Sequence, residues 1–183
     1  ITLNEQIRSG QSELVYRLGT VVESRSKETG KHVKRVALYS QLLAKLYGLS
    51  AEQCELIVLA SPLHDIGKVS TPDNILQKPG SLDKAEWKIM QEHAQIGFNM
   101  LSGSNLILLE TGAKIAGFHH EKYDGTGYPN GLKGEEIPIE GRITSIADVF
   151  DALGSKRCYK EAWPLEKSIK FILDESGKSF DPK

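Results

Sequence analysis

The sequence predicts an all-α domain, a helical bundle with one long loop rich in glycine and proline. Apolar residues recur every three or four positions along most of the chain, which is the spacing of one face of a helix. Several of these stretches begin at a capping residue and end at a glycine. No stretch alternates apolar and polar residues as a half-buried strand does. With 183 residues the chain is long enough to bury the core of one domain.

The predicted helices are separated by short connections and two longer loops. In order along the chain they cover residues 3–26 (one helix or two), 28–48, 51–64, 83–101, 104 or 105–119, 141–154 and 164–175. Gly10 is a weak interruption of the first stretch, whereas Ser50 and Gln53 form a capping box that starts the third. Residues 69–82 are predicted to be a loop or a short turn of helix. Residues 121–138 form a second loop, which is long enough to expect a functional role.

Composition excludes several classes of function. The formal net charge is −1, so the chain has no overall attraction to duplex nucleic acid or to an anionic membrane, and an anionic ligand needs local positive charge. No apolar run approaches the ~20 residues of a membrane helix. Cys54 and Cys158 are isolated cysteines, which is typical of a reducing compartment, and we expect a cytoplasmic protein. The chain starts at Ile1, and we expect it to be part of a longer protein.

The adjacent pair His64 and Asp65 is the first candidate for chemistry. An imidazole beside a carboxylate can bind two metal ions, because the two carboxylate oxygens can bridge while the histidine holds one ion. Taken alone, the pair is more often structural, with His64 as a capping or core residue and Asp65 opening a turn before Gly67. The other histidines of the chain decide between these interpretations.

Five histidines are present, and most of them lie on helices or at helix ends where they could converge. Glu28 and His32 are four residues apart, which places both on one helical face. His119 and His120 are neighbours near a predicted helix end. Asp148 lies in an apolar helical segment, where an unpaired carboxylate is costly to bury and a metal ion would satisfy it.

Each of these residues also has a structural interpretation. Glu28 and His32 would form a solvated helix face, and the pair His119 and His120 would complement the negative end of a helix. His93 would be a surface histidine on a helix whose core side carries Trp87, Met90 and Phe98, and Asp148 would pair with Arg142 or Lys156. All of these interpretations would have to hold independently, so we favour a metal site.

The same residues form a pattern that resembles the HD-GYP subgroup of the HD-domain phosphohydrolases. The pattern reads Glu28-x-x-x-His32, His64-Asp65-x-x-Lys68, His93, His119-His120-Glu121-x-x-Asp124-Gly125-x-Gly127-Tyr128-Pro129, and Ala147-Asp148-x-x-Asp151-Ala152-Leu153 followed by Arg157. It extends from about residue 20 to the C-terminus, and its combination of motifs is specific where a His-Asp pair alone is not. The resemblance implies an HD-domain-like helical fold, with residues 27–183 as the catalytic domain and residues 1–26 as a connector helix or helices.

The resemblance also implies roles for individual residues. The implied metal ligands are His32, His64, Asp65, His93, His119, His120 and Asp148, with Asp65 as a bridging and catalytic carboxylate, and Glu28 resembles the ligand of members that hold a third ion. Lys68 is expected to hold a phosphate during catalysis. The implied substrate contacts are Lys68, Asp151, Arg157 and Lys160, and the aromatic ring of Tyr128 is a further candidate contact. Tyr128 could stack on a guanine or a partner protein, or only anchor its loop. Gly154 and Cys158 depart from the family pattern, which affects the loop near the substrate and leaves the ligand set intact.

The activity that the resemblance implies is metal-dependent hydrolysis of cyclic di-GMP to linear pGpG, and further to GMP, by a hydroxide that bridges the ions. We expect two or three divalent ions. Mixed imidazole and carboxylate ligands suit iron or manganese as well as zinc, and the resemblance favours iron or manganese. One alternative is a phosphodiesterase for another cyclic dinucleotide such as cyclic GMP-AMP, because metal ligands carry no information about the base. The other is a non-catalytic signalling or binding module, which the loss of a ligand would favour, and none is missing.

The expected partners follow from the same considerations. A cyclic dinucleotide is the expected substrate, and neither duplex nucleic acid nor a membrane span is expected. The N-terminal helical stretch could connect to an upstream sensory or receiver domain and pair with a second copy as a homodimer. Its apolar stripe could equally be part of the core.

Overall fold

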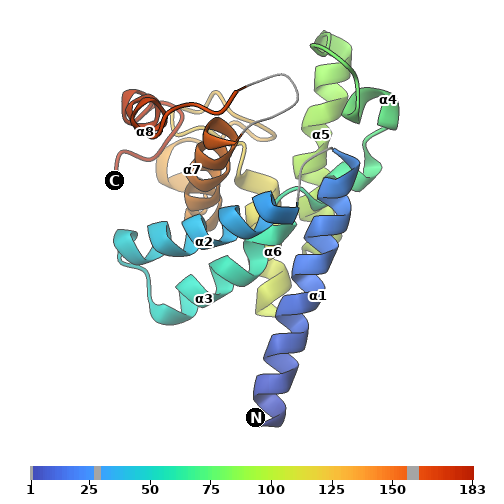
Figure 1. Cartoon of the computed structure of the whole chain (residues 1–183), viewed down its shortest axis with the longest axis vertical. Helices are drawn as coiled ribbons and strands as arrows, with labels where there is room; N and C mark the ends of the chain where they lie inside the picture. Colours follow the sequence, from blue (N-terminus) through green and yellow to red (C-terminus); the bar gives the residue numbers. More distant parts are fainter. Residues whose placement is uncertain (1, 27–29, 156–160) are drawn as a thin grey trace.

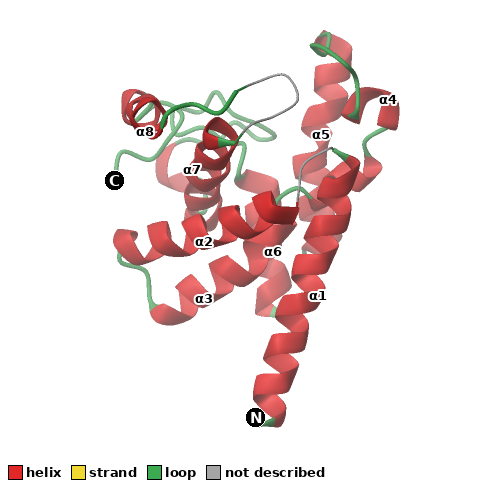
Figure 2. Ribbon diagram, viewed as in Figure 1, coloured by secondary structure: helices red, strands yellow, loops and turns green. Residues whose placement is uncertain are grey.

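The computed structural model describes residues 2–26, 30–155 and 161–183. Within these residues it contains helices and loops but no β-strand, which confirms the predicted all-α class (Figure 2). Figure 1 labels the α-helices, which are α1 (Leu3–Arg25), α2 (Gly30–Tyr47), α3 (Ala51–Ala60), α4 (Asp73–Leu76), α5 (Lys84–Leu101), α6 (Ile107–Phe118), α7 (Ile139–Gly154) and α8 (Leu165–Asp174). Short 3-10 segments are η1 (Ser61–Leu63), η2 (Ile66–Ser70) and η3 (Gly134–Glu136).

The first helix is a single element that runs through Gly10 without a break. Thr2 and Glu5 close a capping box at its start. Its N-terminal half extends beyond the rest of the molecule, and its C-terminal half packs against η1 and η2 (Figure 1). Val15 and Val22 are buried on that half. The helix therefore has a free end and an anchored end.

The third helix ends earlier than predicted. Its capping box of Ser50 and Gln53 is confirmed, but the α-helix stops at Ala60 and does not reach the expected His64. Pro62 explains the difference, because proline has no N–H with which to continue the α-helical hydrogen bonds. The chain continues as η1, and His64 is the residue that follows this tighter turn.

Three other helix starts also differ from the prediction, and one of them is that of α7, which begins at Ile139 and not at residue 141. Helix α6 begins at Ile107, later than the expected 104 or 105, because the Ser104 hydroxyl accepts a hydrogen bond from the Leu106 N–H outside the helix. Pro164 lies just before α8 as its N-cap residue. The segment 69–82 contains the short helix α4, in line with the predicted loop or turn of helix.

The core is apolar where α2, α3 and α7 meet. Ala44, Cys54, Ile57 and Ile143 form one buried cluster there. Among the described residues Cys54 is a buried free thiol, and none of the described helices is both long enough and apolar enough to cross a membrane. The interior also contains buried polar side chains, four of them histidines, and these lie where η1 and η2 meet α1, α2, α5 and α6.

Candidate metal centre

Three of the buried histidines share one hydrogen-bonding arrangement. Their Nδ1 atoms lie near backbone carbonyl oxygens, which only accept: His64 near Ser61 O (2.9 Å), His93 near Met90 O (2.6 Å) and His119 near Ile115 O (3.0 Å). In each ring Nδ1 therefore carries the hydrogen, and in the neutral ring Nε2 keeps a free lone pair. These three Nε2 atoms are buried and have no hydrogen-bond partner in the described structure. Hydrogen bonds from Nδ1 of this kind orient histidine rings so that Nε2 can bind a metal ion.

The carboxylate of Asp65 lies at the centre of these rings. Its Oδ1 atom is 3.3 Å from Nε2 of His93 and 3.8 Å from Nε2 of His119, while its Oδ2 atom is 3.4 Å from Nε2 of His64. The ammonium group of Lys68 donates to Oδ2. The two oxygens of Asp65 thus face different histidines, as a bridging carboxylate requires.

His32 approaches the same centre from the first turn of α2. Its Nδ1 atom donates to Oδ2 of Asp151 at 2.7 Å, and its Nε2 atom is 3.5 Å from Oδ1 of Asp148. Arg35 also binds Asp151, through Nε and Nη2 at 2.5 and 2.9 Å. Burial raises the pKa of Asp151, but the hydrogen bonds from His32 and Arg35 outweigh it and lower that pKa to about 2. Asp151 is therefore a carboxylate that orients His32.

The loop after α6 places an aromatic ring over His120. The Tyr128 ring stacks on the imidazole of His120 with centroids 4.8 Å apart, and His120 lies 5.0 Å from the ring of His93. Glu121 is buried and accepts hydrogen bonds from the backbone N–H groups of Asn130 and Leu132, which holds the loop in shape. The long loop is thus ordered and forms one side of the centre.

The donor atoms fall into two groups, each with all its atoms within 4.8 Å of one another. One group is Asp65, His93, His119 and His120, and the other is Glu23, His32 and His64. Unpartnered, buried nitrogen and oxygen donors at this separation fit divalent metal ions. The described structure therefore contains a His and carboxylate cluster suited to metal binding.

Charges within the cluster shift several pKa values. Burial lowers the pKa of His64, but the charge and hydrogen bond of Asp65, together with the charges of Asp148 and Glu23, outweigh burial and raise this pKa to about 10. Burial lowers the pKa of His119 to about 4 and that of His120 well below its usual range. Burial raises the pKa of Asp65, yet Lys68 and His64 lower it further, so that this carboxyl stays ionised. In the metal-free protein His119 and His120 are therefore neutral, whereas His64 and Lys68 carry positive charges that balance the ionised Asp65, and a metal ion would replace the proton of His64.

Glu23 is the member of the cluster that the sequence analysis missed. It lies near the end of α1 and is 1% exposed. Its position carried a signal, because Val15, Gly19 and Val22 mark the buried face of α1 and Glu23 continues that face one turn after Gly19. An acidic residue on a buried helix face indicates a polar partner inside the protein.

The structure brings together most of the residues singled out in the sequence. The residues that surround one centre are His32, His64, Asp65, Lys68, His93, His119, His120, Tyr128, Asp148 and Asp151. Glu28, Arg157 and Lys160 lie outside the described residues, so their expected roles stay predictions. The substrate contact expected for Asp151 also stays a prediction.

Two of the structural interpretations offered for single residues, a core position for Trp87 and a pair of Arg142 with Asp148, differ from what the structure shows. Trp87, expected in the core, has 47% of its surface exposed, and its ring lies 6.2 Å from that of Tyr128. The core position of Trp87 is therefore wrong, because its side of α5 faces the loop rim and solvent. Arg142, offered as a partner for Asp148, binds Oδ2 of Asp181 at 2.5 Å.

Comparisons with known proteins agree with this geometry. The HD domain family profile matches residues 18–183. The chain is 53% identical over its whole length to a 3'3'-cGAMP-specific phosphodiesterase 2 of Vibrio cholerae, of which it covers 35%. It is 47% identical over 171 residues to a cyclic di-GMP phosphodiesterase of Thermotoga maritima, covering 93% of this chain and 46% of that protein.

Two solved structures are similar in fold. One is a cyclic GMP-AMP specific phosphodiesterase from V. cholerae, with a TM-score of 0.67 and 22% identity over 93% of this chain and 46% of that one. The other is an HDG"Y"P protein from Bdellovibrio bacteriovorus, with a TM-score of 0.62 and 25% identity over 80% of this chain and 47% of that one. The chain spans about a third to a half of the length of the curated relatives that it matches. From the matched profile, the fold and the converging histidines, the chain belongs to the HD domain family, and its motifs resemble those of the HD-GYP subgroup.

Proposed function

We propose that this domain is a metal-dependent phosphodiesterase that hydrolyses a cyclic dinucleotide, with cyclic di-GMP converted to linear pGpG and then to GMP. The observation that carries the proposal is the convergence of unpartnered Nε2 atoms from His64, His93 and His119 on the carboxylate of Asp65. Such a set of donors serves a bound cation, since burying it without one is costly.

The chain's own residues supply binding and orientation. The ions would be held by His32, His64, His93, His119 and His120, together with Asp65 and Asp148. Divalent ions held this way supply an activated water and neutralise charge on the phosphoryl oxygens. Lys68 donates a hydrogen bond to Asp65, which supports the proposal that its ammonium group would hold a phosphate oxygen at the same centre. Burial lowers the pKa of Lys68, but the nearby carboxylates, with Asp65 the largest contributor, together outweigh burial and raise that pKa, which keeps the lysine charged.

The number and identity of the ions belong to the proposal. We expect iron or manganese, because the donors are imidazole and carboxylate and the described part of the cluster contains no thiolate. Two groups of donor atoms support at least two ions. Glu28 remains the expected ligand for a third.

The base preference has two candidates. Relatives at 43% and 47% identity are named for cyclic di-GMP, whereas the V. cholerae relative at 53% is named for 3'3'-cGAMP. This last similarity favours 3'3'-cGAMP as the second candidate substrate. Tyr128 stacks on His120 beside the metal donors, so its ring is positioned to contact a base of either substrate.

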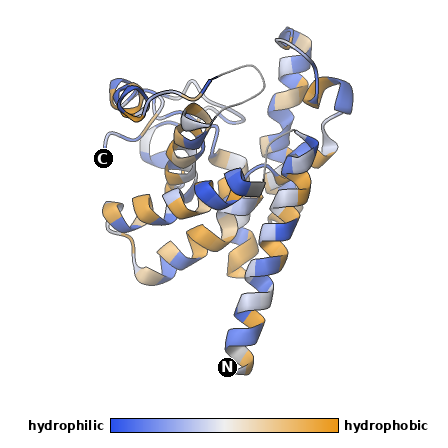
Figure 3. Cartoon of the chain, in the orientation of Figure 1, coloured by the Kyte–Doolittle hydropathy of each residue, from blue (hydrophilic) through white to orange (hydrophobic). Residues whose placement is uncertain are grey.

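The proposal extends to assembly and location. Helix α1 carries five exposed apolar side chains, which are Leu3, Ile7, Leu14, Leu18 and Val21. Figure 3 shows apolar colour recurring along this helix to its N-terminal end. Spacings of three, four and seven residues fit a coiled-coil seam, so a second copy of α1 is the proposed partner. An upstream sensory or receiver domain and a cytoplasmic location remain part of the proposal.

Light scattering on the wild type and on Leu14→Asp tests the proposed dimer. The wild type should be a dimer and the variant a monomer, and a monomeric wild type would refute the dimer.

Turnover assays on the purified domain test the function. Protein loaded with Mn²⁺, or with Fe²⁺ under anaerobic conditions, should convert cyclic di-GMP to pGpG, and chelator-treated protein should not. Running cyclic di-GMP and 3'3'-cGAMP in parallel ranks the two candidates by kcat/KM. Metal-loaded protein that turns over neither would support the non-catalytic alternative.

A further inference from the structure

Glu23 is a buried carboxylate without an adequate partner. Its side chain is 1% exposed, and Oε1 has no hydrogen-bond partner in the described structure. Among the described residues, Oε2 accepts a 3.3 Å hydrogen bond from the hydroxyl of Ser26, and the nearby carboxylate of Asp65 repels the ionised form of Glu23. Without a cation, burial and the charge of Asp65 both disfavour the ionised form of this carboxylate. A side chain buried this way indicates a ligand that the carboxylate faces.

The groups that Glu23 faces are imidazole nitrogens. One of its oxygens lies within 4.8 Å of ring nitrogens of His32 and His64, and these two rings lie edge to face with centroids 5.7 Å apart. The Nδ1 atoms of both histidines already have partners, Asp151 and Ser61 O. The remaining Nε2 atoms and the Glu23 oxygen therefore define one unfilled set of donors.

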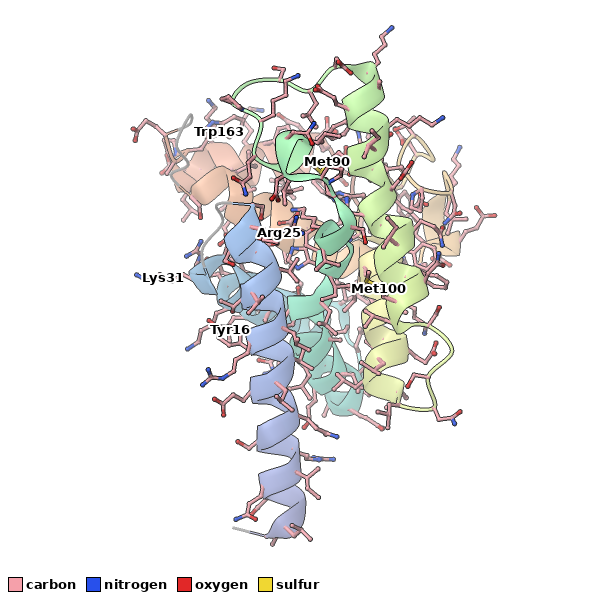
Figure 4. All side chains as sticks on the ribbon, turned by 90° about the vertical axis from the view of Figure 1, so that its right-hand side faces the viewer. Tyr16, Arg25, Lys31, Met90, Met100 and Trp163 are labelled. Carbon is pink, nitrogen blue, oxygen red and sulfur yellow. The ribbon has the colours of Figure 1, made fainter. Side chains whose placement is uncertain are left out.

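Helix α1 is held firmly where it presents Glu23. A Cβ atom added at Gly19 would lie 2.2 Å from the carbonyl oxygen of Pro62, so the helix backbone touches η1 directly. Arg25, labelled in Figure 4, donates to the carbonyl oxygens of Lys68, Val69 and Thr71 and binds the carboxylate of Asp73. These contacts fix the helix on both sides of Glu23, so its carboxylate is preorganised.

From this geometry we infer that Glu23 is a ligand of the metal ion that His32 and His64 hold, so that the N-terminal helix completes the metal centre. The inference rests on metal binding by the proposed phosphodiesterase. The sequence predicted that α1 is only a connector helix. If Glu23 is a ligand, binding of the ion held by His32 and His64 also depends on the position of α1.

Metal content and metal-dependent stability of Glu23→Gln test the inference without relying on activity. The amide keeps the shape of the side chain but is a much weaker ligand. Glu13→Gln is the matched control, because Glu13 is an exposed glutamate on the same helix. For each full-length variant, bound manganese per protein is measured after dialysis, and Tm is measured with and without Mn²⁺.

We expect Glu23→Gln to lose about one ion per chain and most of the rise in Tm that Mn²⁺ produces in the wild type. In metal-free protein its Tm should equal or exceed that of the wild type, because the amide removes repulsion from Asp65. The control should match the wild type in every measurement.

If Glu23 had a purely structural role, Glu23→Gln would lower the Tm equally with and without metal and leave the metal content unchanged, and this result would overturn the inference. Loss of an ion in Glu28→Gln with full content in Glu23→Gln would also overturn it. A wild type that binds no Mn²⁺ would refute the proposed function itself.

Discussion

The Nδ1 atom of His32 lies 2.7 Å from Oδ2 of Asp151, which orients the other ring nitrogen toward the metal donors. Carboxylates in this position typically contribute about 10–100-fold to metal affinity. We expect Asp151→Asn to weaken Mn²⁺ binding by about that factor, measured by competition with a chelator. Asp174→Asn, a change at an exposed carboxylate that pairs only with Lys170 in the described structure, should leave affinity unchanged. Equal affinity in both variants would show that Asp151 does not orient a ligand.

Gly67 allows η2 to lie directly against α5. A Cβ atom at this position would lie 2.0 Å from the carbonyl oxygen of His93 and 2.6 Å from the backbone nitrogen of Gly97. Gly67→Ala should lower the free energy of unfolding by about 3 kcal/mol, because neither backbone can yield without moving the site. Gly10→Ala should instead raise it by about 0.5–1 kcal/mol, since Gly10 has open space in mid-helix. Urea unfolding of metal-free protein measures both, and equal effects would contradict the close packing of η2 on α5.

Metal binding should release protons. The pKa of His64 is raised to about 10 by Asp65, so at pH 7.5 the metal-free ring is protonated and must lose a proton to bind through Nε2. Proton and metal compete for this nitrogen, so affinity rises with pH, about tenfold per unit for each proton displaced. Titration calorimetry in two buffers of different ionisation enthalpy should give at least one proton released per chain. Zero release would contradict the assignment of His64 as a ligand.

Lys68 should contribute to turnover more than to metal retention. Its ammonium group binds Asp65 and is the described cation nearest this carboxylate. Lys68→Met removes a charge that would stabilise the phosphoryl oxygens, and we expect kcat to fall by about 10²–10³ with metal content unchanged. Lys114→Met, at an exposed lysine that pairs with Glu140, serves as the control. A Lys68 variant within twofold of the wild-type kcat would exclude this role.

The sequence predicted the fold class and the chemistry-bearing residues because these depend on residue identity and spacing. Helical periodicity and the Ser50–Gln53 capping box indicated helices that the structure contains. Histidine and aspartate are chemically distinctive, so their pattern pointed to one centre before any packing was known. Their roles as ligands stay predictions until metal is measured.

The features that the sequence analysis missed depend on tertiary contacts. Glu23 is of the same residue type as the exposed glutamates of α1, and its place on the face of Gly19 and Val22 becomes decisive only once the contact of Gly19 with Pro62 shows that this face is buried. Trp87 is apolar enough for a core position, yet its side of α5 meets the rim of the Tyr128 loop and solvent. The end of α3 moved because Pro62 interrupts a helix whose apolar pattern continues to Leu63.

The most direct test of the account is cyclic di-GMP turnover by Asp65→Asn, with metal content measured on the same samples. Asp65 places its two oxygens toward different groups of histidines, so the amide should lose at least one ion. We expect turnover to fall by about a thousandfold or more, the scale of the several kcal/mol that metal ions contribute to such reactions. Turnover within a few-fold of the wild type, with full metal content, would contradict a bridging role for Asp65 and with it the proposed mechanism.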